Sequence, residues 1–129
     1  MPKFQFQKLV RDKIIDHQLA SGAQPTHHRL EGKEYIAALI AKLSEEAGEL
    51  AQTSAEQLAE EFADVQQVLD DLREHLQLSP EAVAIAQQRK NDQNGAFKNG
   101  DYVEYVEVAE DDDWAAYYRA HPERYPEIS

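Results

Sequence analysis

The hydrophobic residues of this chain recur at the three- and four-residue spacing of amphipathic helices. This spacing predicts helices over residues 8–20, 32–53 and 54–78. The apolar stripe of the second stretch contains Ile36, Leu39, Ile40, Leu43, Ala47 and Leu50, and that of the third contains Leu58, Phe62, Val65, Val68, Leu69, Leu72 and Leu76. Helices of this length with broad apolar faces need neighbours, so the pattern favours an all-α bundle completed by a homodimer or homotetramer.

Polar residues mark where the helices begin and end. Ser54 and Gln57 have the spacing of a capping box at the start of the third helix. Ser79 followed by Pro80 predicts the N-terminus of a fourth helix that ends near Lys90. The breaker-rich stretch 21–26 predicts a loop.

The C-terminal third has a different character. Residues 101–108 are rich in tyrosine and valine and suit a short extended segment, while the run Glu110–Asp113 predicts acids at the start of a short helix. Neither a repeat nor a second domain is visible. We therefore expect one domain over 1–129, with a core at about 6–108 and a C-terminal extension at 109–129.

Composition narrows the possible partners. The formal net charge of −12 argues against binding to nucleic-acid polymers or anionic membranes, which require a basic surface. There is no cysteine, which excludes disulfides and thiolate metal sites and suits a cytoplasmic location. The N-terminus is too charged for a signal peptide, and no apolar run approaches membrane-spanning length.

Several carboxylates lie beside the apolar stripes. At about 100° per residue, Glu46 lies roughly 50° and Glu49 about 110° from the centre of the second helix's stripe. On the third helix Glu61 lies about 60° and Asp64 roughly 120° from a centre between Val65 and Leu69. If the two helices pack antiparallel, these four acids converge. Glu45, about 150° away, is expected to face solvent.

Converging carboxylates need positive charge, because they otherwise raise one another's pKa values. Few basic residues are present on these two helices, and no histidine accompanies the acids. Oxygen-only ligation predicts Mg²⁺, with Mn²⁺ as the second choice. The alternative is an ordinary solvated acidic face, since glutamate is a good helix former.

The segments "EEAGE" (Glu45, Glu46, Glu49) and "EFAD" (Glu61, Asp64) resemble the EExxE…ExxD signature of MazG-like nucleotide pyrophosphohydrolases. "KLVRDKI" at 8–14 and "NGAF" at 94–97 look like the phosphoribosyl-ATP pyrophosphohydrolase-like branch, although an arginine common in relatives is missing from "NGAF". The resemblance implies Mg²⁺-dependent hydrolysis of a nucleotide between its α and β phosphates. It assigns Glu46, Glu49, Glu61 and Asp64 to the metal and leaves Glu45 as a catalytic candidate.

Basic residues are candidates for the substrate's phosphates. Arg89 and Lys90 are the obvious replacements for the missing arginine, and Lys8 and Arg11 belong to a local basic cluster with Lys13. Each has a structural alternative as an ordinary salt bridge or a helix-end charge. The adjacent His27 and His28 lack zinc-site spacing.

Alternatives to this function remain open. One is hydrolysis of phosphoribosyl-ATP in histidine synthesis, and another is a catalytically silent helical dimerisation module. The C-terminal aromatic residues can stack on a base, although packing on the bundle or at an interface is the simpler role. These residues are Tyr102, Tyr105, Trp114, Tyr117 and Tyr118.

Overall fold

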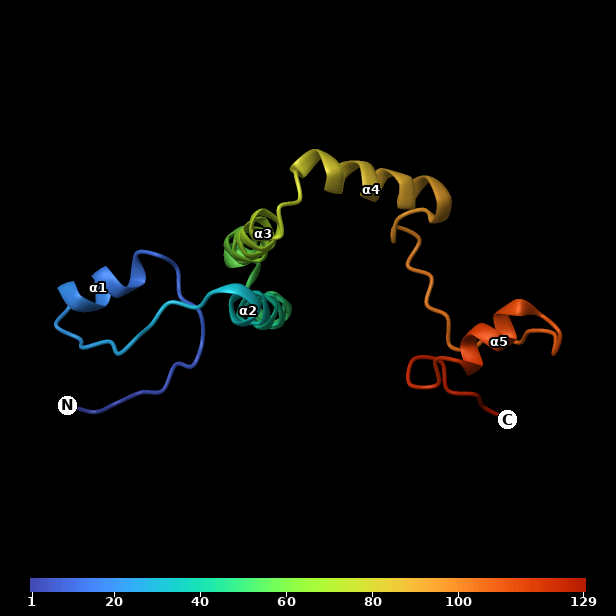
Figure 1. Ribbon diagram of the computed structural model, residues 1–129, viewed down its shortest axis with the longest axis horizontal. Helices are drawn as coiled ribbons and strands as arrows, with labels where there is room; N and C mark the ends of the chain where they lie inside the picture. Colours follow the sequence, from blue (N-terminus) through green and yellow to red (C-terminus); the bar gives the residue numbers. More distant parts are fainter. The chain divides into compact units, whose positions relative to one another are not determined.

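The computed structural model describes residues 1–129 and contains helices but no strand, which confirms the all-α class. Its elements are α1 (Ile14–Ala20), α2 (Gly32–Gln52), the 3₁₀ helix η1 (Ala55–Gln57), α3 (Leu58–His75), α4 (Pro80–Asn94) and α5 (Asp113–Arg119), shown in Figure 1. They form two compact units, Met1–Lys90 and Asn91–Ser129. None of the helices is long and apolar enough to cross a membrane.

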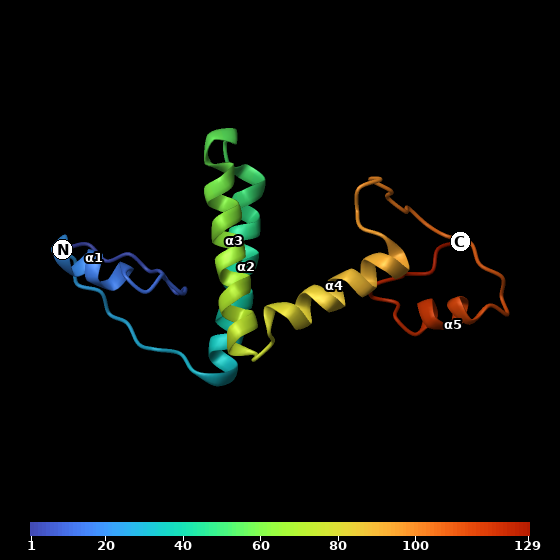
Figure 2. The ribbon, with the colours of Figure 1, turned by 90° about the horizontal axis from the view of Figure 1, so that it is seen from above.

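Helices α2 and α3 pack side by side as an antiparallel hairpin (Figure 2). The chain turns between them through Thr53, Ser54 and η1, so the end of α2 lies beside the start of α3. At the open end of the hairpin the rings of Tyr35 and His75 meet edge to face, with centroids 4.8 Å apart. The predicted second helix is therefore confirmed almost to the residue.

Burial along α2 follows a coiled-coil-like spacing of three and four residues. Leu39 and Glu46 are buried, and Ile36, Leu43 and Leu50 are half-buried. Along α3 the corresponding face contains buried Val68 and half-buried Glu61, Val65 and Leu72. Glutamates thus fill one core position in each helix of the hairpin.

A second apolar stripe on the hairpin remains exposed. On α3 it contains Leu58, Phe62 and Leu69, it continues at Leu76 just after α3, and on α2 it contains Ile40. Phe62 is 59 % exposed although the sequence pattern placed it with the core residues. The acidic residues therefore lie at the α2–α3 contact, and much of the predicted apolar face of α3 points elsewhere.

The first predicted helix begins later than expected. Residues 8–13 are irregular, and α1 starts only at Ile14. A helix beginning at Lys8 would place Lys8, Arg11 and Lys13 at the positive end of the helix dipole, which disfavours cations. In the structure Lys8 and Arg11 instead form ion pairs with α2 and α3.

Of the two predicted serine caps, the structure contains one. The predicted capping box at Ser54 is not formed, because no side chain caps η1 there. The predicted cap at Ser79 is confirmed, since its Oγ accepts a hydrogen bond from the Ala82 N–H at 3.0 Å. The fourth helix continues past Lys90 to Asn94.

The end of α3 is a Schellman motif. The Leu78 N–H donates to the Arg73 carbonyl at 3.1 Å, and the Gln77 N–H donates to the Glu74 carbonyl at 3.0 Å. This motif requires a left-handed residue, and Gln77 supplies it with φ of 58°. Glycine would adopt this conformation without the steric cost of a side chain.

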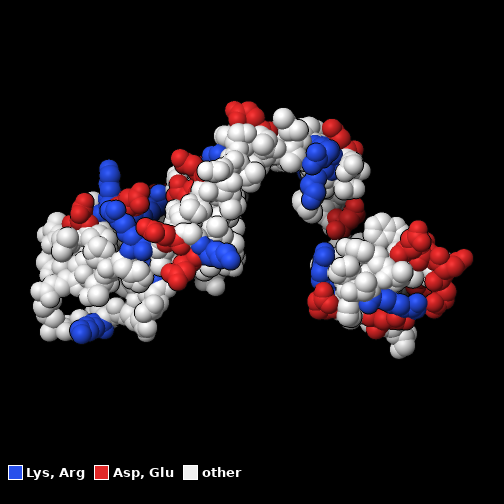
Figure 3. All heavy atoms as spheres, viewed as in Figure 1, with Lys and Arg blue, Asp and Glu red and all other residues white.

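The unit Asn91–Ser129 is organised around α5. Asp112 caps α5 by accepting a hydrogen bond from the Trp114 N–H at 2.8 Å, as the acidic run predicted. The Arg119 guanidinium pairs with Glu110 and Glu127 on either side of the helix. The rings of Trp114, Tyr117, Tyr118 and Tyr125 pack together. Acidic side chains gather on the face of this unit that Figure 3 shows.

Replacing Gln77 with glycine should stabilise the hairpin. The Gln77→Gly protein is expected to gain about 1 kcal/mol in free energy of unfolding, because the left-handed residue no longer carries a side chain. Gln52→Gly, at the last position of α2 and without a positive φ, should instead lose about 0.5–1 kcal/mol. Urea denaturation followed by circular dichroism measures both values, and a loss of stability in Gln77→Gly would contradict the cap.

Candidate metal centre

The five predicted acidic residues gather on the α2–α3 hairpin. One group contains Glu45, Glu46 and Glu49, and a second contains Glu46, Glu61 and Asp64. Within each group one oxygen from every residue lies within 4.8 Å of the others. The two groups, which we call the α2 triad and the inter-helix triad, share Glu46. The structure thus brings together all four acids for which the helical geometry predicted convergence.

Glu46 is the central residue of the site. It is only 7 % exposed, and its Oε1 lies 3.3 Å from the Lys42 Nζ, one helical turn earlier. Its Oε2 is buried and has no hydrogen-bond partner. Desolvation, together with the nearby Glu49, raises the pKa of Glu46 against the opposing effect of Lys42. A buried carboxylate oxygen without a partner is costly and requires an explanation.

Glu61 faces Glu46 from the opposite helix. Its Oε2 is likewise buried without a partner. Desolvation raises its pKa, and the negative charges of Asp64, Glu46 and Glu60 raise it further. The two unpartnered oxygens therefore belong to the two glutamates that occupy core positions of the hairpin.

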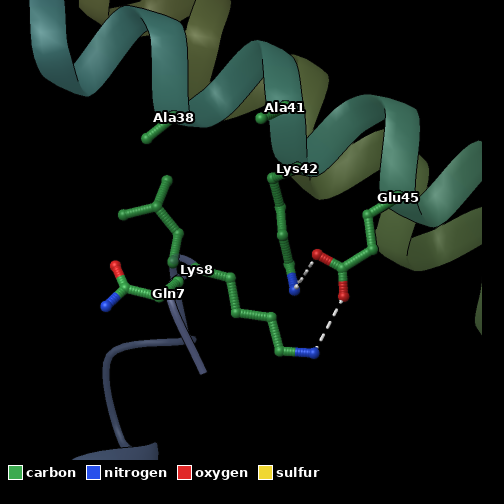
Figure 4. A pocket seen from close by; sticks show the side chains of 7 residues that line it. Gln7, Lys8, Ala38, Ala41, Lys42 and Glu45 are labelled. Atoms are coloured by element: carbon green, nitrogen blue, oxygen red, sulfur yellow. Dashed lines mark hydrogen bonds and ion pairs between the residues drawn. The ribbon is translucent and has the colours of Figure 1, made fainter. Parts of the chain in front are cut away.

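Glu45 does not point away from the site as the helical wheel predicted. Lys8 Nζ lies 3.1 Å from its Oε1 and Lys42 Nζ lies 3.4 Å from its Oε2, so two lysines converge on one carboxylate (Figure 4). Partial desolvation would raise the pKa of Glu45, but these hydrogen bonds and charges outweigh it and hold the pKa below its ordinary value. The wheel missed this because Lys8 comes from outside the helix.

Asp64 receives the other basic residue of the N-terminal segment. The Arg11 Nη2 lies 2.5 Å from the Asp64 Oδ1. Five carboxylates on the hairpin are therefore accompanied by three cations, Lys8, Arg11 and Lys42. The cluster retains a formal charge of −2, which equals the charge that one divalent ion would supply.

The donor set fits a hard divalent cation. All candidate ligands are carboxylate oxygens, which Mg²⁺ and Mn²⁺ prefer. The unpartnered Oε2 atoms of Glu46 and Glu61 supply buried donors from both helices. The inter-helix triad (Glu46, Glu61 and Asp64) combines the two core carboxylates with Asp64, and Glu49 extends the set along the exposed edge of α2.

Most of the other predicted residues are exposed. Arg89 and Lys90 are exposed on α4, and neither makes an ion pair with the cluster. His27 and His28 lie exposed in an irregular segment. The aromatic residues Trp114, Tyr117 and Tyr118 pack against one another, whereas Tyr102 and Tyr105 are 89 % and 64 % exposed. Of the predicted phosphate-binding residues, the structure places Lys8 and Arg11 at the acidic cluster.

Lys42 belongs to the site and was not among the predicted site residues. It is three residues before Glu45 and four before Glu46, a spacing that places the side chains on one helix face. Its side chain is only 19 % exposed. The spacing of three and four residues from Glu45 and Glu46 is therefore a signal in the sequence that identifies Lys42.

The metal-free protein should become more stable as the pH falls from neutrality toward about 4.5. The raised pKa values of Glu46 and Glu61 mean that their stabilising contribution is complete below the ordinary carboxyl value of 4.5 and is lost as the pH rises through their folded-state values. Glu45, whose pKa is lowered, acts in the opposite direction only below that value. Urea denaturation in EDTA across this pH range measures the trend.

Glu46→Gln tests the source of this trend. The neutral side chain should raise the stability of the metal-free protein at pH 7 by about 1 kcal/mol, because it removes a buried charge, and should flatten the pH dependence. It should also abolish stabilisation by Mg²⁺. Glu56→Gln, an exposed acid on η1, removes the same charge outside the cluster and should leave both responses unchanged. Destabilisation by Glu46→Gln in EDTA would contradict a strained buried carboxylate.

Comparison of the chain with protein-family models, with curated proteins and with solved structures gave no match. The resemblance to MazG-like pyrophosphohydrolases therefore rests on the motif residues themselves. The geometry of the carboxylates is an independent observation, because it depends on burial and distance and on no relative.

Proposed function

We propose that this protein is a Mg²⁺-dependent nucleotide pyrophosphohydrolase whose metal is held by Glu46, Glu49, Glu61 and Asp64. The observation that carries the proposal is the buried, unpartnered Oε2 of Glu46 at the point shared by two carboxylate triads. A purely structural acidic face would be solvated, and its oxygens would find water. Divalent metal is the simplest group that satisfies these atoms.

The substrate class comes from the motif resemblance. The spacing Glu45, Glu46, Glu49 followed by Glu61 and Asp64 resembles that of enzymes that split nucleoside triphosphates into a monophosphate and pyrophosphate. Those substrates carry several negative charges, which a protein of net charge −12 would repel. Metal and the cations Lys8, Arg11 and Lys42 together provide the local positive charge that such a substrate needs.

The chemistry is largely positioning and electrostatic stabilisation. When bound, Mg²⁺ would orient phosphate oxygens and lower the pKa of a water molecule. Lys42, beside Glu45 and Glu46, places a fixed positive charge at the edge of the carboxylates. Glu45, which Lys42 contacts from the same helix, is a hydrogen-bond acceptor that can orient the attacking water.

A single chain offers little shelter to a nucleotide. The hollow between residues 7–9 and α2 measures about 160 Å³, and Ala38 and Ala41 line it on the α2 side (Figure 4). Ligand pockets usually measure about 300–1,000 Å³. The exposed stripe of Phe62, Leu69 and Ile40 gives the hairpin an apolar surface for another helix pair. We therefore include a homodimer or homotetramer in the proposal, with neighbouring chains completing the pocket walls.

Loss of one ligand should abolish activity and spare the fold. Glu49→Gln and Asp64→Asn are each expected to reduce Mg²⁺-dependent pyrophosphate release by at least about a hundredfold, since both remove a charged metal ligand. Helicity measured by circular dichroism should be unchanged, because both side chains lie outside the fully buried core. Glu56→Gln should retain wild-type release. Retained activity in either ligand variant would contradict the site.

A nucleotide panel separates the alternatives. The protein is incubated with Mg²⁺ and canonical triphosphates, noncanonical triphosphates or phosphoribosyl-ATP, and pyrophosphate is assayed. Release from triphosphates supports the proposal, and release from phosphoribosyl-ATP alone assigns the histidine-synthesis reaction. No release from any nucleotide, combined with no thermal shift on adding Mg²⁺, would favour the catalytically silent helical module.

A further inference from the structure

The N-terminal segment reaches both helices of the hairpin through two cations. Lys8 pairs with Glu45 on α2, and three residues later Arg11 pairs with Asp64 on α3. The segment is irregular rather than helical, and Gln7 immediately before it has a left-handed φ of 49°. A short stretch of chain therefore spans the acidic cluster.

Each of these cations occupies a carboxylate of a different triad. Glu45 belongs to the α2 triad (Glu45, Glu46 and Glu49), and Asp64 belongs to the inter-helix triad. Asp64 is one of the four proposed metal ligands, and Glu45 belongs to the same triad as two others, Glu46 and Glu49. Both triads are thus partly neutralised by the same segment, and ion and segment compete for the same charges.

We infer that Lys8 and Arg11 act as an internal counter-ion that leaves the carboxylates when a divalent cation binds and then pairs with the phosphates of the substrate. The inference rests on the proposed function, because it assigns the segment a role at that same metal centre. It adds two steps to that function. A metal ion replaces Lys8 and Arg11 at the carboxylates, and the released side chains then bind phosphate.

The burial of the three cations indicates which of them can move. The side chains of Lys8 and Arg11 are 45 % and 58 % exposed, and ion pairs at such exposure are weak and easily exchanged. Lys42 is only 19 % exposed, and its backbone is fixed in the middle of α2. The exchange therefore involves the N-terminal segment, and Lys42 stays with Glu46.

The released cations have a use only if an anion follows the metal. A metal bound through the carboxylates of both triads would neutralise the charges that now hold Lys8 and Arg11. Two exposed cations beside a bound metal then form a site for phosphate oxygens, which arginine and lysine both recognise. The exchange thus couples metal binding to the appearance of a positively charged surface.

The test measures the affinity for Mn²⁺ and the affinity for a nucleotide analogue, which should change in opposite directions. Arg11→Gln, Lys8→Gln and the double variant are titrated with Mn²⁺, followed by electron paramagnetic resonance of the free ion. Each single variant should bind Mn²⁺ about two- to fivefold more tightly, since the competing cation is gone. At saturating Mn²⁺, the double variant should bind a nucleoside triphosphate with a methylene bridge between its α and β phosphorus atoms at least about tenfold more weakly.

Lys13→Gln is the matched control, because it removes a positive charge from the same stretch without removing an ion pair to the cluster. Its two affinities should stay within a factor of two of wild type. Equal changes in Lys13→Gln and Arg11→Gln would show a general charge effect and overturn the exchange.

The remaining outcomes separate the inference from the proposed function. Weaker binding of both Mn²⁺ and the analogue in Arg11→Gln and Lys8→Gln would indicate a structural role and overturn the exchange. Unchanged affinities in these variants would overturn it and leave the metal centre standing. No Mn²⁺ binding by any protein would overturn the metal centre and the exchange together. Exchange without pyrophosphate release from the panel would contradict the proposed function alone.

Discussion

The contact between α2 and α3 has glutamates at two of its core positions. Cations from α2 and from the N-terminal segment accompany the acidic cluster that these glutamates belong to. Glu46 and Glu61 occupy sites where the spacing of Leu39, Leu43, Val65 and Val68 calls for apolar side chains. Apolar residues would pack there at no electrostatic cost, so the glutamates reduce the intrinsic stability of the hairpin. Such a cost is typical of positions kept for function rather than for folding.

The positive charges around the glutamates come from two sources with different properties. Lys42 belongs to α2 and is sheltered, so it forms a permanent part of the site. Lys8 and Arg11 arrive on an irregular segment and remain largely exposed. Of the three cations, only Lys42 is adjacent to Glu46. The negative charge that the cations leave uncompensated therefore lies between α2 and α3.

The sequence predicted the helices better than it predicted their orientation. The boundaries of α2 and the cap at Ser79 followed from local chemistry, which acts within a few residues. The apolar pattern predicts the wrong face of α3 at the contact with α2. The centre of that face was taken from the apolar residues alone, and Glu61 is itself a core residue. The true face lies toward Val68, and Phe62 lies outside it.

Long-range ion pairs were the part that sequence could not supply. Nothing in the spacing of Lys8 and Arg11 indicates that they meet Glu45 and Asp64, which lie 37 and 53 residues away. A helix over residues 8–13 was the natural reading of local periodicity, and tertiary electrostatics overrode it. Lys42, by contrast, stood within one helical turn of its partners and could have been identified from the sequence.

The acids all come from one continuous stretch between Glu45 and Asp64, joined by a short turn. Hairpins with such local contacts form early in folding, because closing a short loop costs little entropy. We therefore expect the carboxylates to meet before the distant N-terminal cations have docked. Repulsion among them should slow this step, so divalent cations in the surrounding solution should act on the folding rate as well as on the finished structure.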